Sequence, residues 1–221
     1  LDEARGARVT RAVAAGEELF YSYGCKGNAE LALGYGFAVW GNPHELARIR
    51  LDLDSLLSAE DPKFDRVVGV FEEVFDRVVG DADFCRRDET KATFKLSSED
   101  LTDSGSSACN AWTALCQFCV AMHLDLGKAT PEDLLVELLS KASAELIGPQ
   151  SPEAWEAHVA AVRASDTVQV SEAASCACST VGVTTALRHA QLSVVRAAMR
   201  KVAAMGPLPR QRRAKGRGRG R

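Results

Sequence analysis

The residues best suited to chemistry lie between Ala15 and Phe37, in the segment AGEELFYSYGCKGNAELALGYGF. Tyr21, Tyr23 and Phe37 occur here together with several glycines, which permit sharp turns. A tyrosine hydroxyl has a reference pKa of about 10, so it stays neutral at physiological pH and both donates and accepts hydrogen bonds. Aromatic faces can also hold a cation. The alternative interpretation is that these aromatics are ordinary core residues around a hairpin.

Two short elements are expected to position these side chains. The run Glu17–Tyr23 is rich in aromatic residues, as strands are, and it follows a turn at residues 15–16. Asn28 is a suitable N-cap for a helix that carries Leu31 and Tyr35 four residues apart. Gly36 is a suitable end for that helix. The segment is therefore predicted to form a strand, a turn and a short helix.

Four motifs follow one another in this segment: GEEL at residues 16–19, YG at 23–24, NAEL at 28–31 and YGF at 35–37. In this order and spacing they resemble the end of a SET domain. The similar branch is the one that contains the Rubisco large-subunit lysine methyltransferases and the actin-histidine methyltransferases. The motifs cover the first fifty residues. Beyond them, the resemblance depends on the order of elements, because in that branch an all-helical substrate-binding domain follows the SET core.

The resemblance implies an enzyme that transfers a methyl group from S-adenosylmethionine to a lysine, or less often a histidine, of a protein docked on the helical domain. It implies that Tyr23 is the catalytic residue, which orients the accepting nitrogen and the methyl group. It also implies that Gly36 and Phe37 bind the cofactor, with the phenylalanine against the adenine. A lysine amine with a reference pKa of about 10.4 loses its proton at neutral pH only at a cost of roughly 4–5 kcal/mol, so such an enzyme needs a dry channel.

The resemblance also calls for a glycine-containing cofactor loop and an Asn-His pair, both of which should precede Leu1. The sequence contains no Asn-His dipeptide. We therefore expect an incomplete catalytic domain from a longer protein, inactive and unable to bind S-adenosylmethionine tightly by itself. The alternative is a non-catalytic interaction module, in which the remnant of the SET domain supports a protein-binding helical part and the basic tail adds affinity for nucleic acid.

The composition indicates the general class of protein. A hydrophobic share of 46% and a charged share of 26% are typical of a globular protein, and no apolar run reaches the eighteen residues of a membrane span. The seven cysteines occur without a secretory signal, which favours reduced thiols in an intracellular compartment. Cys116 and Cys119 lie in an apolar helical run and are interpreted as buried thiols. Cys176 and Cys178 lack the further cysteine that a zinc site requires, so no metal site is predicted.

The sequence as a whole predicts an α+β fold in three parts: a β-rich remnant of a SET domain at residues 1–53, a helical bundle at 54–205 and a disordered Arg/Gly-rich tail at 206–221. A strand is expected around Arg8–Val13. Alternating Ile49, Leu51 and Leu53 predict a half-buried strand at residues 47–53. Residues 84–96 are interpreted as a hairpin or an irregular strand. Helices are predicted at residues 62–80, at 108–124, from Thr130 to Gly148, from Ser151 onward and at 184–204.

The tail differs from the rest of the chain in charge. It contains seven Lys and Arg residues and no Asp or Glu. The rest of the chain contains 20 Lys and Arg and 30 Asp and Glu, which gives it a net charge of −10. Alternating Gly and Arg resemble segments that bind RNA loosely. The alternative interpretation is a solvated tail without a partner.

Overall fold

The computed structural model describes residues 11–18, 22–80, 83–102, 110–169 and 175–209. They form the predicted α+β fold, in which helix (54%) far outweighs strand (13%). Within this described part of the chain, no helix combines the length and apolar character needed to cross a bilayer. The elements in chain order are α1 (Asn28–Tyr35), β1 (Ala38–Val39), β2 (Leu46–Asp52), α2 (Leu53–Leu56), α3 (Phe64–Val78), β3 (Cys85–Asp88), β4 (Lys91–Ser97), the 3-10 turn η1 (Glu99–Leu101), α4 (Ala111–Met122), α5 (Pro131–Ile147), α6 (Pro152–Ser165), β5 (Val168–Gln169), β6 (Ser175–Ala177) and α7 (Thr180–Ala204).

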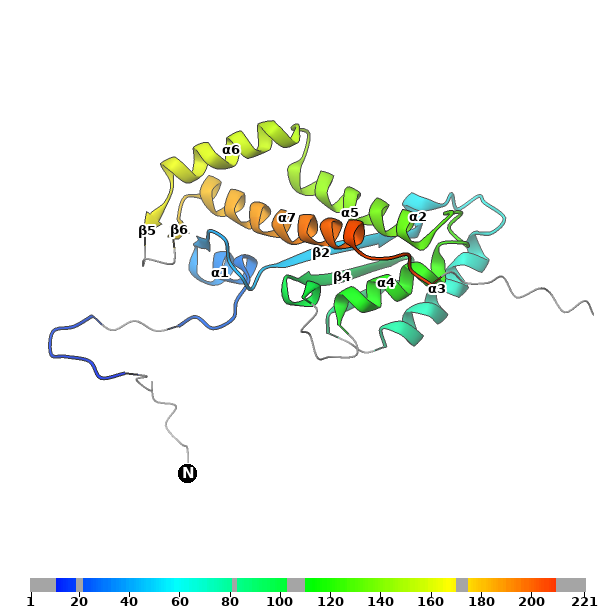
Figure 1. Ribbon diagram of the computed structural model, residues 1–221, viewed down its shortest axis with the longest axis horizontal. Helices are drawn as coiled ribbons and strands as arrows, with labels where there is room; N and C mark the ends of the chain where they lie inside the picture. The colour runs from blue at the N-terminus through cyan, green and yellow to red at the C-terminus, as the bar shows by residue number, and fades with distance from the viewer. Residues whose placement is uncertain (1–10, 19–21, 81–82, 103–109, 170–174, 210–221) are drawn as a thin grey trace, which may run out of the picture.

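The long helix α7 lies in the middle of the fold, with α6 and α5 above it and β2 and β4 below it in the view of Figure 1. Its start is fixed by Ser179, whose hydroxyl accepts the Gly182 N–H at 3.0 Å. Because this cap precedes Thr180, the helix begins four residues earlier than the predicted Thr184. Residues of α7 belong to both of the hydrophobic cores described below.

The larger sheet has the strand order β2-β4-β3 and is antiparallel throughout. The alternation predicted for β2 is confirmed, with Ile49 and Leu51 buried. Leu53 is also buried but begins α2, because Asp52 ends the strand and accepts the Asp54 N–H. The hairpin predicted at residues 84–96 is confirmed as β3 and β4.

Residues 54–205 are therefore not all helical, which corrects the sequence-based expectation. The hairpin contributes two strands that pair with β2, so this sheet crosses the predicted boundary between residues 53 and 54. The physical reason is burial, because Ala92, Phe94 and Leu96 alternate along β4 and face the same core as β2.

A large hydrophobic core lies between this sheet and α3, α4, α5 and the end of α7. Phe118 of α4 lies at its centre, with its ring 5.6 Å from Phe71 and 5.7 Å from Phe94. Cys116 and Cys119 are buried in α4, as predicted. Burial raises the pKa of the Cys116 thiol to about 12. These thiols are therefore packing groups.

Two helix N-termini that the sequence predicted from strong local signals are confirmed. Thr130 and Asp133 form a reciprocal capping box with Pro131 in the first turn of α5. Ser151 caps α6 with its hydroxyl, which accepts the Ala154 N–H at 3.2 Å, and a proline again follows the cap. α3 and α4 lie within their predicted ranges.

A smaller core lies at the other end of the fold. β1 pairs with β6, and β6 with β5, in a second antiparallel sheet. Trp40, Trp155 and Leu192 are buried there, and the Arg188 guanidinium stacks on the Trp155 ring at 4.9 Å. α1 packs at this end and carries the candidate site.

Candidate functional site

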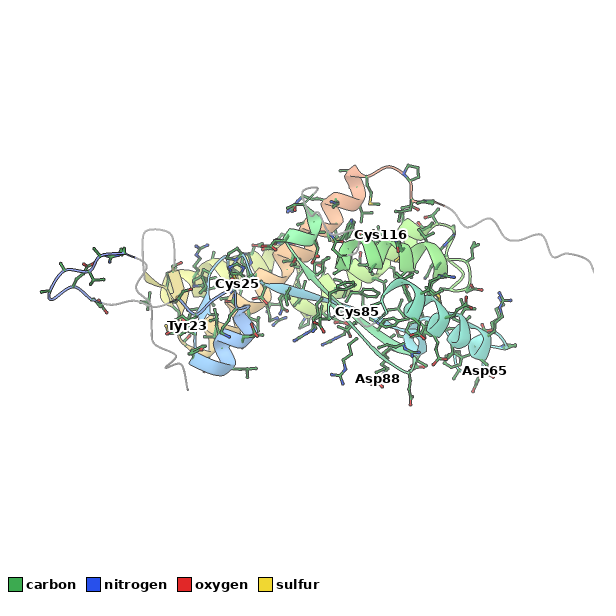
Figure 2. The ribbon with its side chains drawn as sticks, turned by 90° about the horizontal axis from the view of Figure 1, so that it is seen from below. Tyr23, Cys25, Asp65, Cys85, Asp88 and Cys116 are labelled. Carbon is green, nitrogen blue, oxygen red and sulfur yellow. The ribbon has the colours of Figure 1, made fainter. Side chains whose placement is uncertain are left out.

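Tyr23 and Phe37, two of the three aromatic residues singled out from the sequence, form one cluster with Tyr35 of α1, and the third, Tyr21, lies outside the described residues. The Tyr23 ring lies 4.5 Å from the Tyr35 ring and 5.3 Å from the Phe37 ring, measured between centroids, and both pairs meet edge to face. Tyr23 is 36% exposed and Tyr35 48% exposed. In Figure 2 the labelled Tyr23 lies beside α1, at the end of the molecule away from Asp65. The cluster therefore forms an aromatic surface open to solvent.

Gly36 connects two members of this cluster. It ends α1 in the left-handed conformation, with φ 76° and its N–H bonded to the Ala32 carbonyl at 3.0 Å. The glycine C-cap predicted from sequence is thus confirmed. A Cβ at Gly36 would meet no atom within 4 Å, so the backbone conformation, and not crowding, favours glycine here. The space beside this glycine is open.

The segment that carries Tyr23 is held by short-range bonds. The Gly24 N–H donates to the Ser22 hydroxyl at 3.1 Å, and Gly24 has φ 78°. The strand predicted at Glu17–Tyr23 is not found in its described residues: Glu17, Glu18, Ser22 and Tyr23 are irregular, and residues 19–21 lie outside the described part. The described residues of the segment pair with no strand, and high strand propensity alone cannot form one.

Two other predictions fall on the same end of the chain. The turn at residues 15–16 is confirmed, because Ala14 and Glu17 exchange hydrogen bonds across it. Of the strand expected at Arg8–Val13, residues 8–10 lie outside the described part and residues 11–13 are irregular.

A buried polar network fixes α1 to the rest of the fold. The side chain of Asn28 is fully buried and holds the Val39 peptide on both sides, donating to its carbonyl at 3.0 Å and accepting its N–H at 2.9 Å. The Asn42 amide donates to the same Asn28 oxygen at 3.0 Å and to the Lys26 carbonyl at 2.9 Å. The sequence suggested Asn28 as the N-cap of α1. In the structure Gly27 is the N-cap and Asn28 is the first residue of the helix. Its side chain is engaged by β1.

Glu45 takes over the capping role. Gly27 precedes α1 and has no side chain to offer, and the Glu45 carboxylate accepts the Asn28 N–H at 2.9 Å. The same carboxylate accepts the Gln191 amide of α7 at 3.4 Å. Only 2% of Glu45 is exposed, and this burial raises the pKa of its carboxyl above the ordinary value. Glu45 thus links α1 to α7 through a buried acid.

A cavity of about 280 Å³ opens beside this network, at residues that sequence reasoning did not select. Its lining includes three ionisable residues: Glu30 of α1, His44 and Glu99 of η1. No group of three or more His, Cys, Asp or Glu in the described ranges is arranged to hold a metal ion. The cavity is lined by Cys25, Gly27, Glu30, Pro43, His44, Leu46, Ser97 and Glu99.

The structure therefore brings Tyr23, Gly36 and Phe37 together, as the resemblance required, and leaves their chemical roles as predictions. Sequence reasoning missed Asn42 and Glu45 as parts of the site. The only local signal for them was the Asn42-Pro43 turn, which indicates a loop and not a hydrogen-bond partner. Neither a family model nor a curated protein matches the sequence of this chain.

Proposed function

We propose that this chain forms the C-terminal part of a SET-type protein methyltransferase that modifies a lysine of a protein partner. Residues 1–53 are then the end of the catalytic domain and residues 54–205 the substrate-binding part. Of the basic tail predicted at residues 206–221, Leu208 packs against the large core and donates its N–H to Glu132, and residues 210–221 lie outside the described part of the chain. The observation that supports this best is the position of the Tyr23 ring, 5.3 Å from Phe37 and next to the left-handed Gly36. A phenol beside an open glycine turn is the arrangement that the four sequence motifs call for.

In this proposal Gly36 and Phe37 would hold S-adenosylmethionine at one side of the site. The half-buried Phe37 ring would stack on the flat adenine, and no atom would crowd a ligand beside Gly36. When bound, the cofactor supplies an electrophilic methyl group on a sulfonium. The cation is compatible with the aromatic faces of Tyr23 and Tyr35, which favour positive charge.

In this proposal Tyr23 positions the accepting amine. Its hydroxyl would accept a hydrogen bond from the lysine nitrogen and so hold the nitrogen lone pair in line for transfer. Tyr35 would form the wall opposite the amine, since its ring meets the Tyr23 ring edge to face. Glu45 would hold the start of α1, and the Asn28 side chain, bonded to Val39, would hold the backbone just after Phe37 at a fixed position.

The test is transfer of tritiated methyl groups from S-adenosylmethionine into the proteins of a cell extract by the full-length protein. Tyr23→Phe should lower the rate by about 100-fold or more, the usual effect of losing a positioned polar group. Tyr35→Phe is the matched control, because it removes the same atom from the neighbouring ring, and it should cost less than about tenfold. A folded Tyr23→Phe variant with the wild-type rate would contradict the role given to Tyr23.

A second function, a non-catalytic protein-interaction module, is favoured by one observation. The Tyr23 and Tyr35 rings are 36% and 48% exposed, and an exposed aromatic surface is typical of a protein interface. In that case the full-length protein should transfer no methyl group in the same assay, and pull-down of partners should depend on Tyr35 as much as on Tyr23.

A further inference from the structure

The larger sheet has one face on the core and one face toward solvent. Along β2 and β4 every second residue is buried in the large core, and the residues between them project from the opposite side of the sheet. All side chains of this second set are exposed or half-buried. We call this surface the outer face. It consists of Leu46, Arg48, Arg50 and Asp52 on β2, Lys91, Thr93, Lys95 and Ser97 on β4, and Arg86 and Asp88 on β3.

Four cations lie together in the middle of the outer face. In the strand register Arg48 lies opposite Lys95, and Thr93 lies between Arg50 on one neighbouring strand and Arg86 on the other. Like charges that face each other across antiparallel strands repel and destabilise a sheet. A counter-charge from another molecule would relieve this repulsion.

The protein itself supplies little counter-charge to this cluster. Neither Arg48 nor Arg86 forms an ion pair with any other residue that the structure describes. Arg50 has a carboxylate partner, Glu145 of α5 at 3.6 Å, but the two side chains are 60% and 45% exposed, and exposed pairs of this kind contribute little. The Lys95 amine donates to a backbone carbonyl at 3.1 Å and keeps its charge. The cluster is therefore available to an anionic partner.

Acidic residues bound the cluster along the direction of the strands. At one end Asp52 pairs with Lys91 at 3.5 Å, and Asp88 lies opposite the same lysine. At the other end, the cavity of about 280 Å³ described above contains Glu30 and Glu99 in its lining, together with the first residue of β2 and the last of β4. A long polyanion would have to pass these acids, which repel it, whereas a short acidic segment fits between them.

We propose that the outer face binds a short acidic segment of a protein partner, in extended conformation and with carboxylates at alternate positions. Alternate side chains of an extended chain are about 6.8 Å apart, which is also the spacing between Arg48 and Arg50 on β2. Each carboxylate then accepts charge-assisted hydrogen bonds from a guanidinium. A peptide fits better than single-stranded RNA, because the strands place no aromatic residue on the outer face for bases to stack on. This inference does not depend on the proposed methyl transfer.

The test is fluorescence anisotropy of the full chain with a labelled peptide in which four aspartates alternate with threonines. A second peptide of the same composition has its four aspartates in one block, so that only two of them can face the cluster. The alternating peptide should bind at least about fivefold more tightly, and its affinity should fall as salt is raised. Equal affinity of the two peptides, or no binding of either, would overturn the proposal.

Two double variants locate the site. Arg48→Glu with Arg86→Glu should weaken the alternating peptide by about tenfold or more. It should not lower the melting temperature, because both side chains are exposed and the repulsion between residue 48 and Lys95 is removed. Lys63→Glu with Arg77→Glu makes the same change of charge at exposed positions outside the outer face, and it should weaken the peptide by less than about threefold.

Two results would refute the proposal. One is an equal loss of affinity in the two double variants, which would show that only the total charge matters. The other is a single-stranded RNA of equal charge that binds more tightly than the peptide and is weakened by Arg48→Glu with Arg86→Glu.

Discussion

Asn28→Ala tests whether the network of Asn28, Asn42 and Glu45 holds the candidate site. The substitution removes three side-chain hydrogen bonds and leaves the N–H and the carbonyl of Val39 without their Asn28 partner. An unsatisfied buried polar group costs about 1–3 kcal/mol. Because Val39 is only half-buried, water will form some of the hydrogen bonds that its N–H and carbonyl lose. We therefore expect the free energy of unfolding to fall by about 2–4 kcal/mol.

The assay is urea unfolding followed by circular dichroism, with amide hydrogen exchange at Val39 as a local measure. Leu33→Ala is the control: it lies on the same helix, is 92% exposed and should change stability by less than about 0.5 kcal/mol. Asn28→Asp keeps the acceptor for the Val39 N–H but loses the donor and brings a second carboxylate close to Glu45. It should therefore be at least as destabilising as Asn28→Ala at neutral pH and improve on acidification. A loss for Asn28→Ala no larger than that for Leu33→Ala would refute the reasoning.

Three further predictions concern other parts of the fold. Burial raises the pKa of the Glu45 carboxyl, so the folded state binds a proton there more tightly than the unfolded state does. The contribution of Glu45 to stability should therefore fall as pH rises from the ordinary carboxyl pKa through the raised pKa. Unfolding of Glu45→Gln measured over the same pH range should lack that fall. Gly182→Ala should lower the melting temperature despite the higher helix propensity of alanine, because its Cβ would lie 1.6 Å from an Asp166 oxygen and would push that carboxylate off its hydrogen bonds to Ser179. In an Asp166→Ala background, where those bonds are already lost, Gly182→Ala should cost less. Iodoacetamide at mild alkaline pH should modify the exposed Cys25 in the native protein and Cys116 only after unfolding, which peptide mass spectrometry would show.

Much of the scaffold was predictable because its signals are local. Thr130 and Ser151 are followed by proline at the first helical position, so the starts of α5 and α6 can be read from three or four residues. The alternation of Ile49 and Leu51 is likewise contained within one strand. Strand propensity was a less reliable signal where no neighbouring strand was available for pairing. The described residues at both ends of the predicted strand Glu17–Tyr23 are irregular.

The site was predictable only in part. The closeness of Tyr23 to the Gly36-Phe37 turn followed from the ordered motifs and is found in the structure. The contacts that hold this turn were not predictable, because they join residues far apart in sequence. Glu45 bonds Asn28 across 17 residues and Gln191 across 146. Polar partners at such separations depend on the packing of whole elements, about which a single sequence carries no local pattern.

These long-range bonds suggest how the two ends of the molecule differ in stability. The larger core buries the sheet of β2, β4 and β3 against four helices, whereas α1 and β1 depend on the smaller core and on a few polar bonds. β1 has only two residues, and Asn28 supplies to Val39 the hydrogen bonds that a longer strand would obtain from a neighbour. Local opening is cheapest where apolar contacts are few. The aromatic cluster can therefore loosen while the large core stays folded, and Glu45, bonded to both α1 and α7, is the group that opposes such an opening.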